Sequence, residues 1–129
     1  MMKTELSIGL KGNMDIEVAM HHTAAHYGSG LIEVYATPAM IGHLENTAQQ
    51  SVQKYLPDGY ITVGISIEVK HLKATPVGKK VSCFTTLTAV EDRKLIFSLK
   101  AFDEDGEIGN GTHERFIVHK EKFFKKISS

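Results

Sequence analysis

Three polar residues have types and spacing that favour chemistry: Thr37, Glu45 and His71. Glu45 follows Ile41 by four residues and precedes Ala48 by three, so helical geometry places its carboxylate on or beside an apolar stripe. His71 ends the apolar face of an alternating segment. If that face packs on the helix, the carboxylate and the imidazole approach from opposite layers. Such a pair has the ingredients of a nucleophile or base with an acid.

Each of these residues also has a structural explanation. Thr37 fits a helix N-cap, and Glu45 fits a carboxylate at the edge of the stripe that reaches solvent. His71 fits a core histidine bonded to a backbone carbonyl. Eight residues along a straight helix span roughly 12 Å. Thr37 and Glu45 would therefore share a site only at a bend where the helix starts, around a substrate, or across a subunit interface.

One long helix is predicted from residue 37 onward. Thr37 suits the N-cap, Pro38 suits the first helical position, and the turn sequence at residues 56–59 ends the pattern. Apolar residues recur between these limits at helical spacing: Ile41, Leu44, Ala48, Val52 and Tyr55.

Alternating segments on either side of this helix predict strands. Residues 4–10 form the first, with Leu6, Ile8 and Leu10 on one side. Residues 62–72 form a half-buried strand with one continuous inner face, made of Val63, Ile65, Ile67, Val69 and His71. Residues 81–90, 95–102 and 108–118 follow with short turns and indicate an antiparallel meander. The expected fold is α+β, with the helix on one face of the sheet.

Composition limits the class of protein. The chain has 15 Lys and Arg against 15 Asp and Glu, a formal net charge of zero, and 42% hydrophobic residues. These values predict one domain over residues 1–129 and argue against a nucleic-acid partner. The longest uncharged stretch, residues 18–32, contains three histidines and does not resemble a membrane span. The basic cluster after residue 119 is expected to be a solvated strand end or tail.

The remaining polar candidates favour structural roles. Cys83 is the only cysteine and cannot form an internal disulfide, which together with the lack of a secretory leader pattern favours the cytoplasm. It is expected to be a small buried hydrophobe. His21, His22 and His26 lack a partner carboxylate at ligand spacing, so no metal is expected. The run Gly109-Asn110-Gly111 indicates a bulge or a close backbone approach.

The sequence resembles a known family over about residues 37–118. V-Y-A-T-P leads to G-H-L-E, and V-K-H-L-K-A-T-P-V-G and I-G-N-G-T-H-E-R follow. These strings resemble the hot-dog-fold acyl-CoA thioesterases related to fluoroacetyl-CoA thioesterase. That family uses a threonine, a glutamate eight residues later and a histidine 26 after that, which Thr37, Glu45 and His71 match.

The resemblance implies a hot-dog fold, in which a curved antiparallel sheet wraps a long central helix. It implies hydrolysis of a small acyl-CoA thioester without a cofactor, in a homodimer with active sites at the subunit interface, and it leaves a tetramer open. Glu45 would be the nucleophile or general base, His71 its acid-base partner and Thr37 a polar orienting group. Gly64 and Arg115 match positions near the bound substrate.

Some alternatives stay open. Gly64 would also fit a strand bulge, and Arg115 a surface or interface salt bridge. The whole chain would also fit a non-catalytic acyl-CoA or small-ligand binding protein. An acyl-CoA hydratase would need a different His/Asp arrangement, which the sequence does not show. The family lid ahead of the threonine carries phenylalanine, whereas residues 21–36 here contain none, only Tyr27 and Tyr35.

Overall fold

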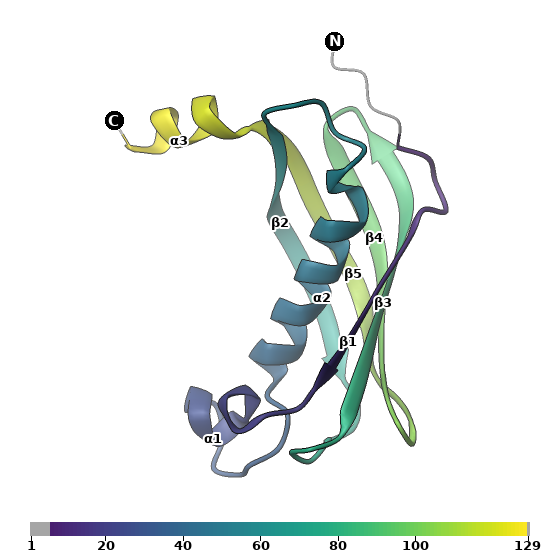
Figure 1. The fold of residues 1–129 in the computed structure, drawn as a ribbon, viewed down its shortest axis with the longest axis vertical. Helices are drawn as coiled ribbons and strands as arrows, with labels where there is room; N and C mark the ends of the chain where they lie inside the picture. The colour runs from purple at the N-terminus through teal and green to yellow at the C-terminus, as the bar shows by residue number, and fades with distance from the viewer. Residues whose placement is uncertain (1–5, 129) are drawn as a thin grey trace.

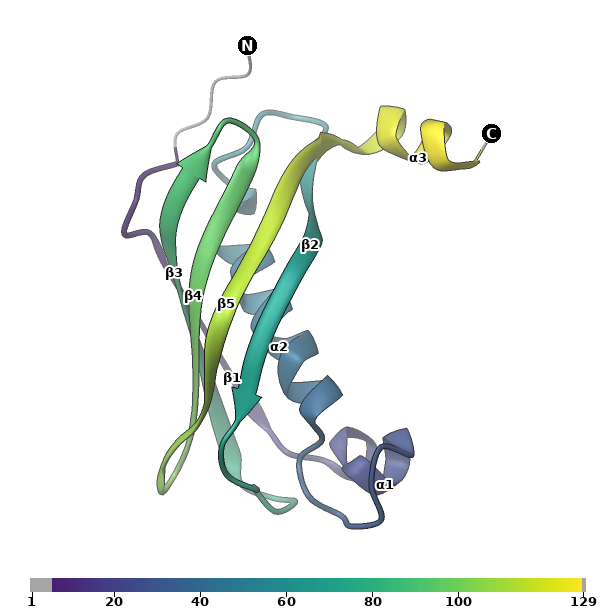
Figure 2. The same ribbon diagram turned by 180° about the vertical axis from the view of Figure 1, so that it is seen from behind.

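A computed structural model describes residues 6–128. Five antiparallel strands form one sheet in the order β1-β3-β4-β5-β2, seen from its outer side in Figure 2. The strands are β1 (Lys11–Glu17), β2 (Tyr60–His71), β3 (Lys80–Glu91), β4 (Lys94–Asp103) and β5 (Gly106–His119). The helical elements are the 3₁₀ turn η1 (Met20–His22), α1 (Ala24–Tyr27), α2 (Thr37–Gln53) and α3 (Lys120–Ser128).

Helix α2 lies along the inner face of the curved sheet (Figure 1). Its predicted stripe is confirmed, because Leu44, Ala48 and Val52 are fully buried. The predicted N-cap is wrong by one residue. Ala36 has extended backbone angles and occupies the cap position without a side-chain hydrogen bond, and Thr37 is the first helical residue. The Thr37 side chain is therefore not used for capping.

The first strand begins later than predicted. Residues 4 and 5 lie outside the described residues, and residues 6–10 form a turn in which Gly9 has φ +97°. That left-handed conformation favours glycine and interrupts the extended run. Gly9 and Leu10 already bond to the backbone of Leu87, and the regular register of β1 with β3 starts at Lys11 opposite Thr86. Gly12 then lets β1 approach α2, since an added Cβ would lie 2.7 Å from Ser51 Cβ.

A bulge in β2 divides the predicted inner face. Gly64 pairs with Arg115 and Ser66 with Glu114, so Ile65 has no opposite residue on β5. Ile65 is 51% exposed. Val63 and Ile65 therefore do not share a face with Ile67, Val69 and His71, because one extra residue reverses the alternation. Before the bulge, Thr62 and Gly64 face inward instead.

Gly109 and Gly111 of β5 allow a close approach of neighbouring atoms, which was one of the two alternatives predicted for this run. A Cβ on Gly111 would lie 1.9 Å from the Glu68 carbonyl oxygen, and one on Gly109 would lie 2.8 Å from Met40 Cε. Cys83 is fully buried, as predicted, and burial raises the pKa of its thiol to about 11.

The basic C-terminal segment forms a helix rather than a strand end or an extended tail. Helix α3 projects away from the sheet (Figures 1 and 2), with Phe124 65% exposed. Within residues 6–128, the structure contains no helix with the length and apolar character needed to span a membrane.

Candidate active site

Thr37 and His71 form a polar pair where α2 begins and β2 ends. Thr37 Oγ1 and His71 Nδ1 share a hydrogen bond of 2.8 Å. The imidazole is half-buried, and burial lowers the pKa of His71, an effect that the backbone of Lys73 partly opposes. Within the described residues His71 Nε2 is buried and has no hydrogen-bond partner. The pair thus contains a neutral imidazole with Nδ1 held by Thr37 and Nε2 buried without a partner among the described residues.

Tyr35 packs against His71 and is bonded to His43, and the sequence analysis assigned a role to neither Tyr35 nor His43. The Tyr35 ring is 1% exposed and stands edge-on to the His71 ring, with 6.3 Å between centroids. The Tyr35 hydroxyl bonds to His43 Nδ1, and the edge of His22 packs on His43 at 4.9 Å. Burial lowers the pKa of both His22 and His43. These contacts connect the segment before α2 to the polar pair.

A pocket of about 450 Å³ opens at the Thr37–His71 pair. It lies between the start of α2, the end of β2 and the segment around α1. Its lining residues are Ala24, Ser29, Val34, Tyr35, Ala36, Thr37, Pro38, His71, Leu72, Lys73 and Ala74.

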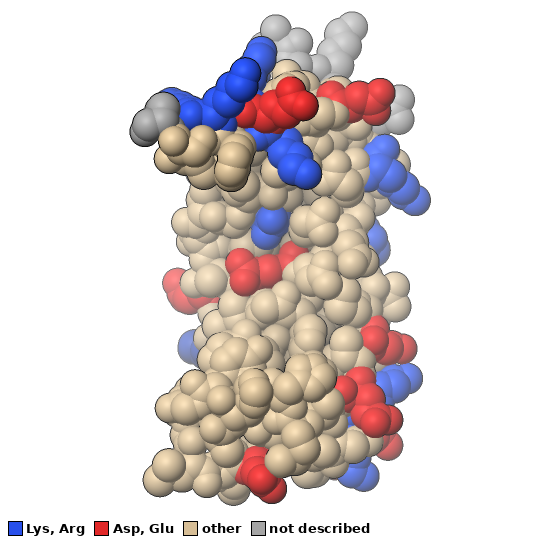
Figure 3. All heavy atoms as spheres, turned by 60° about the vertical axis from the view of Figure 1, so that its left-hand side comes forward, with Lys and Arg blue, Asp and Glu red and all other residues tan. Residues whose placement is uncertain are grey.

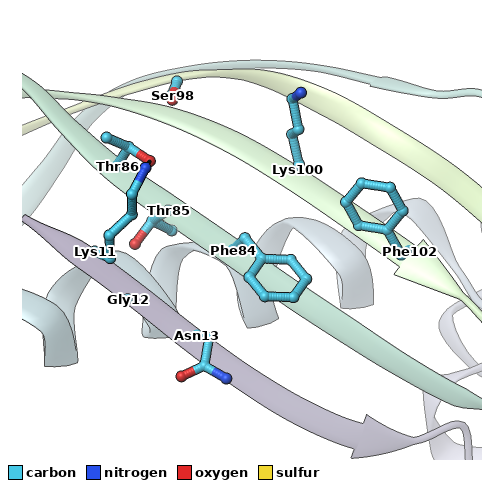
Figure 4. A pocket seen from close by; sticks show the side chains of 9 residues that line it. All are labelled: Lys11, Gly12, Asn13, Phe84, Thr85, Thr86, Ser98, Lys100 and Phe102. Atoms are coloured by element: carbon cyan, nitrogen blue, oxygen red, sulfur yellow. Dashed lines mark hydrogen bonds between the residues drawn. The ribbon is translucent and has the colours of Figure 1, made fainter. Parts of the chain in front are cut away.

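A larger hollow of about 790 Å³ lies elsewhere, on the outer face of β1, β3 and β4 (Figure 4). Phe84 and Phe102 form its apolar wall, with ring centroids 5.8 Å apart. Lys11 and Lys100 flank the wall, and none of the predicted site residues lines this hollow. The smaller pocket is therefore the candidate active site.

Glu45 belongs to a second group, centred on Gly64. An added Cβ at Gly64 would lie 3.1 Å from Glu45 Oε2 and 3.5 Å from Arg115 Nη1. The Arg115 guanidinium is buried, and Nε and Nη2 donate to Thr62 Oγ1 and to the Thr62 carbonyl at 2.7 and 2.9 Å. Burial lowers the pKa of Arg115 and the Glu45 charge raises it. A carboxylate thus lies beside a fixed buried cation.

The two groups are separate within one chain. No contact joins Glu45 to His71 among the described residues, and the eight residues from Thr37 to Glu45 extend roughly 12 Å along α2. The structure thus brings Thr37 together with His71, and Glu45 together with Gly64 and Arg115. In residues 6–128 no cluster of three or more His, Cys, Asp or Glu could hold a metal ion, and His26 packs on Tyr27 instead.

A long helix lying in the concave face of a five-stranded antiparallel sheet is the architecture of the hot-dog fold. The model of the fluoroacetyl-CoA-specific thioesterases matches residues 18–121. The fluoroacetyl-CoA thioesterase of Streptantibioticus cattleyicolor is 36% identical over 132 residues, which covers 98% of this chain and 95% of that protein. The chain belongs to the fluoroacetyl-CoA-specific thioesterase family and is an acyl-CoA thioester hydrolase.

Solved structures agree with this assignment. A crystal structure of a mutant of the fluoroacetyl-CoA-specific thioesterase superimposes with a TM-score of 0.90 at 36% identity, over 97% of each chain. A hot-dog-like protein from Thermanaerovibrio acidaminovorans superimposes with a TM-score of 0.87 at 26% identity, over 95% of this chain and 90% of that one. The predicted hot-dog fold is confirmed.

Proposed function

We propose that the chain hydrolyses a small acyl-CoA thioester with Glu45, His71 and Thr37 as its catalytic residues. The observation that carries this proposal is how the side chains of Glu45 and His71 are held and which of their polar atoms lack a partner. Glu45 is an acidic side chain beside a buried cation, and none of the described residues hydrogen-bonds to it. His71 is held by Thr37 at one nitrogen, and its other nitrogen is buried without a hydrogen-bond partner among the described residues.

Two routes fit these residues. In the first, a Glu45 oxygen attacks the thioester carbonyl, the C–S bond breaks, and the CoA thiolate leaves; it takes up the proton that neutral His71 removes from the water of the next step. Water then cleaves the resulting mixed anhydride and restores the carboxylate. In the second, Glu45 takes a proton from a water molecule that attacks the carbonyl directly, the C–S bond breaks, and the CoA thiolate leaves and takes up that proton. Backbone N–H donors would hold the oxyanion in either route, and neither route needs a metal or redox cofactor.

The proposed substrate is a short or medium acyl-CoA. A related fluoroacetyl-CoA-specific thioesterase mutant has been solved in complex with fluoroacetate and CoA, with a TM-score of 0.86 and 35% identity over 92% of this chain and 99% of that one. The pocket at Thr37 and His71 would receive the acyl end. We place this reaction in the cytoplasm, where the unpaired Cys83 stays reduced.

The proposed assembly is a homodimer in which Glu45 of one chain serves the Thr37–His71 pair of its partner. Strand β2 is an edge strand, and the face seen in Figure 3 is uncharged over most of the end that carries α1. Large apolar side chains are exposed on α1, on β2 and in the loops beside them: Tyr27, Leu31, Ile32, Ile65 and Leu72. A closed two-fold pairing would cover both the edge and this surface.

The first experiment measures thiol release from acetyl-, butyryl- and hexanoyl-CoA by the wild type and by Glu45→Gln. The amide keeps the shape of the side chain but has neither charge nor basicity, so the loss should exceed the ~10²-fold lower range of acid-base catalysis. Circular dichroism checks that the variant is folded. Thiol release by Glu45→Gln at the wild-type rate would remove Glu45 from the mechanism, and binding without turnover by the wild type would favour the ligand-binding alternative.

The second experiment tests the shared site by mixing two inactive variants, Glu45→Gln and His71→Ala, after unfolding and refolding together. If each site takes Glu45 and His71 from different chains, every mixed dimer contains one intact site. Random pairing should then restore about a quarter of wild-type activity. If both residues come from the same chain, the mixture stays inactive.

A further inference from the structure

His113 is a buried histidine that the proposed reaction does not use. It lies on β5 and is 1% exposed. Its ring packs on Phe97 with 6.1 Å between centroids, and its Nδ1 lies 2.7 Å from the Ser66 carbonyl oxygen. Its Nε2 lies 3.2 Å from Arg115 Nη1. Every polar atom of this imidazole is therefore bonded to a named partner.

These partners determine which nitrogen carries the proton. A carbonyl oxygen only accepts hydrogen bonds, so His113 Nδ1 donates to Ser66. Arginine only donates, so Nε2 must be the accepting nitrogen of a neutral ring. Burial lowers the pKa of His113, which agrees with this neutral form, although the Ser66 carbonyl acts in the opposite sense.

The bulge of β2 makes this arrangement possible. Ser66 follows the unpaired Ile65, and the bulge leaves Gly64 on the inner face, where a side chain would crowd the Glu45 carboxylate and contact Arg115. His113 Cε1 lies 3.4 Å from the position of that missing Cβ. His113, Arg115 and Glu45 thus surround the same point on the sheet.

Arg115 is fixed at three of its donors. Thr62 accepts from Nε and Nη2, while His113 is the acceptor at Nη1, the guanidinium nitrogen next to Gly64. If Thr62 alone held Arg115, the guanidinium would keep its plane. Its Nη1, the nitrogen nearest to Gly64 and Glu45, would lose its acceptor. The direction of the positive charge toward Glu45 depends on the His113 acceptor.

We propose that His113 is a positioning residue: its Nε2 lone pair holds Arg115 so that the guanidinium charge stays beside the Glu45 carboxylate. This inference rests on the proposed role of Glu45. His113 itself touches neither the acyl group nor the reacting atoms. Its effect is to keep the carboxylate directed for attack on the thioester or for activation of water.

Two substitutions separate this role from a structural one. In His113→Asn, the amide N–H replaces the Nδ1 donor and keeps the bond to Ser66, but no acceptor reaches Arg115. In His113→Gln, the longer side chain places an amide oxygen near the Nε2 position and keeps the acceptor for Arg115, but loses the bond to Ser66. A positioning role predicts that kcat falls about 10- to 100-fold in His113→Asn, the size of a lost bond to a charged group. In His113→Gln kcat should stay within a few-fold of wild type, and KM should change little in either variant.

A spectroscopic measurement follows Arg115 directly. The sequence contains only two arginines, Arg93 and Arg115, so the guanidinium ¹⁵N–¹H spectrum holds two sets of signals. The Nη signals of Arg115 should broaden or average in His113→Asn and stay resolved in His113→Gln. Arg93, which does not contact His113, serves as the internal control.

The opposite result overturns the inference. If His113→Asn is at least as active as His113→Gln, and both activities follow the melting temperatures, His113 only stabilises the sheet. Unchanged Arg115 signals in His113→Asn would have the same meaning. Both results are distinct from a failure of the proposed mechanism, which would show itself as full activity in Glu45→Gln.

Discussion

Thr37 Oγ1 and His71 Nδ1 share a 2.8 Å hydrogen bond that joins the first residue of α2 to the last residue of β2. The bond exists because the N-cap position belongs to Ala36, which leaves the threonine hydroxyl free to turn toward the sheet. Two elements distant in the sequence are therefore coupled by one side-chain contact at the mouth of the pocket.

We expect Thr37→Val to lower kcat by about tenfold or more while the melting temperature changes little. Valine keeps the branched shape but has no hydroxyl for His71, and the substitution removes no cap. Loss of a capping hydroxyl would instead cost about 1 kcal/mol of stability. Thr37→Ser keeps the hydroxyl and should retain most activity. A large fall in melting temperature for Thr37→Val would contradict this assignment.

The pH dependence of the rate should report the protonation of the His71 imidazole. Burial lowers its pKa below the ordinary value of about 6.5, so the imidazole is neutral at pH 7. Protonation in acid would remove the basic nitrogen, and kcat/KM should fall as the pH drops below the ordinary histidine range. His71→Ala should be nearly inactive and should lack this limb. If the limb persists in His71→Ala, it belongs to another group.

The stability of the fold should also decrease in acid. Burial lowers the pKa of His22, His43, His71 and His113 in the folded state. The unfolded chain then binds more protons as the pH falls below about 6.5, so the free energy of unfolding decreases with falling pH. Thermal denaturation between pH 7.5 and 5 checks this sign. A melting temperature that rises toward pH 5 would show that these histidines do not lower the net stability of the fold in acid.

Two glycine substitutions should separate the site from the fold. Gly64→Ala places a Cβ 3.1 Å from Glu45 Oε2, a contact that the flexible carboxylate relieves by moving. Activity should fall roughly 10- to 100-fold, because a small displacement of a reacting group is costly, while the chain stays folded. Gly111→Ala places a Cβ 1.9 Å from the rigid Glu68 carbonyl and should abolish folding. Equal melting temperatures for the two variants would refute this distinction.

Selectivity for fluoroacetyl-CoA over acetyl-CoA should be weak. The segment ahead of Thr37 has no phenylalanine, and Tyr35 lines the pocket as a buried side chain bonded to His43. Tyr27 and Leu31 are exposed. Apolar pocket differences of this size alter selectivity by only ~1–3 kcal/mol. The measurement compares kcat/KM for both substrates on one preparation, and a preference of several orders of magnitude would locate specificity elsewhere.

Periodicity predicted the long helix and the antiparallel meander because both bury one continuous face. It could not predict the bulge at Ile65, since Val63, Ile65, Ile67 and Val69 alternate without interruption and only pairing with β5 shows the extra residue. The types and spacing of Thr37, Glu45 and His71 were sufficient to predict them as candidate catalytic residues.

Thr37 and His71 lie in one group and Glu45 in another. This division depends on three-dimensional packing, which spacing along the chain does not predict. The position of His113 beside Arg115 on β5 was visible in the sequence. Its significance was not, because a buried histidine in a strand most often has only a structural role.

The burial of Cys83 has a practical consequence for enzymology. Its thiol is the only one in the chain, points from β3 into the core, and is almost fully protonated at the neutral or mildly alkaline pH of a thiol-detection assay. A reagent that reacts with thiolates should therefore detect the CoA released by the folded enzyme with no background from the protein. The same reagent becomes a probe of unfolding, since one new thiol per chain is exposed when the sheet opens.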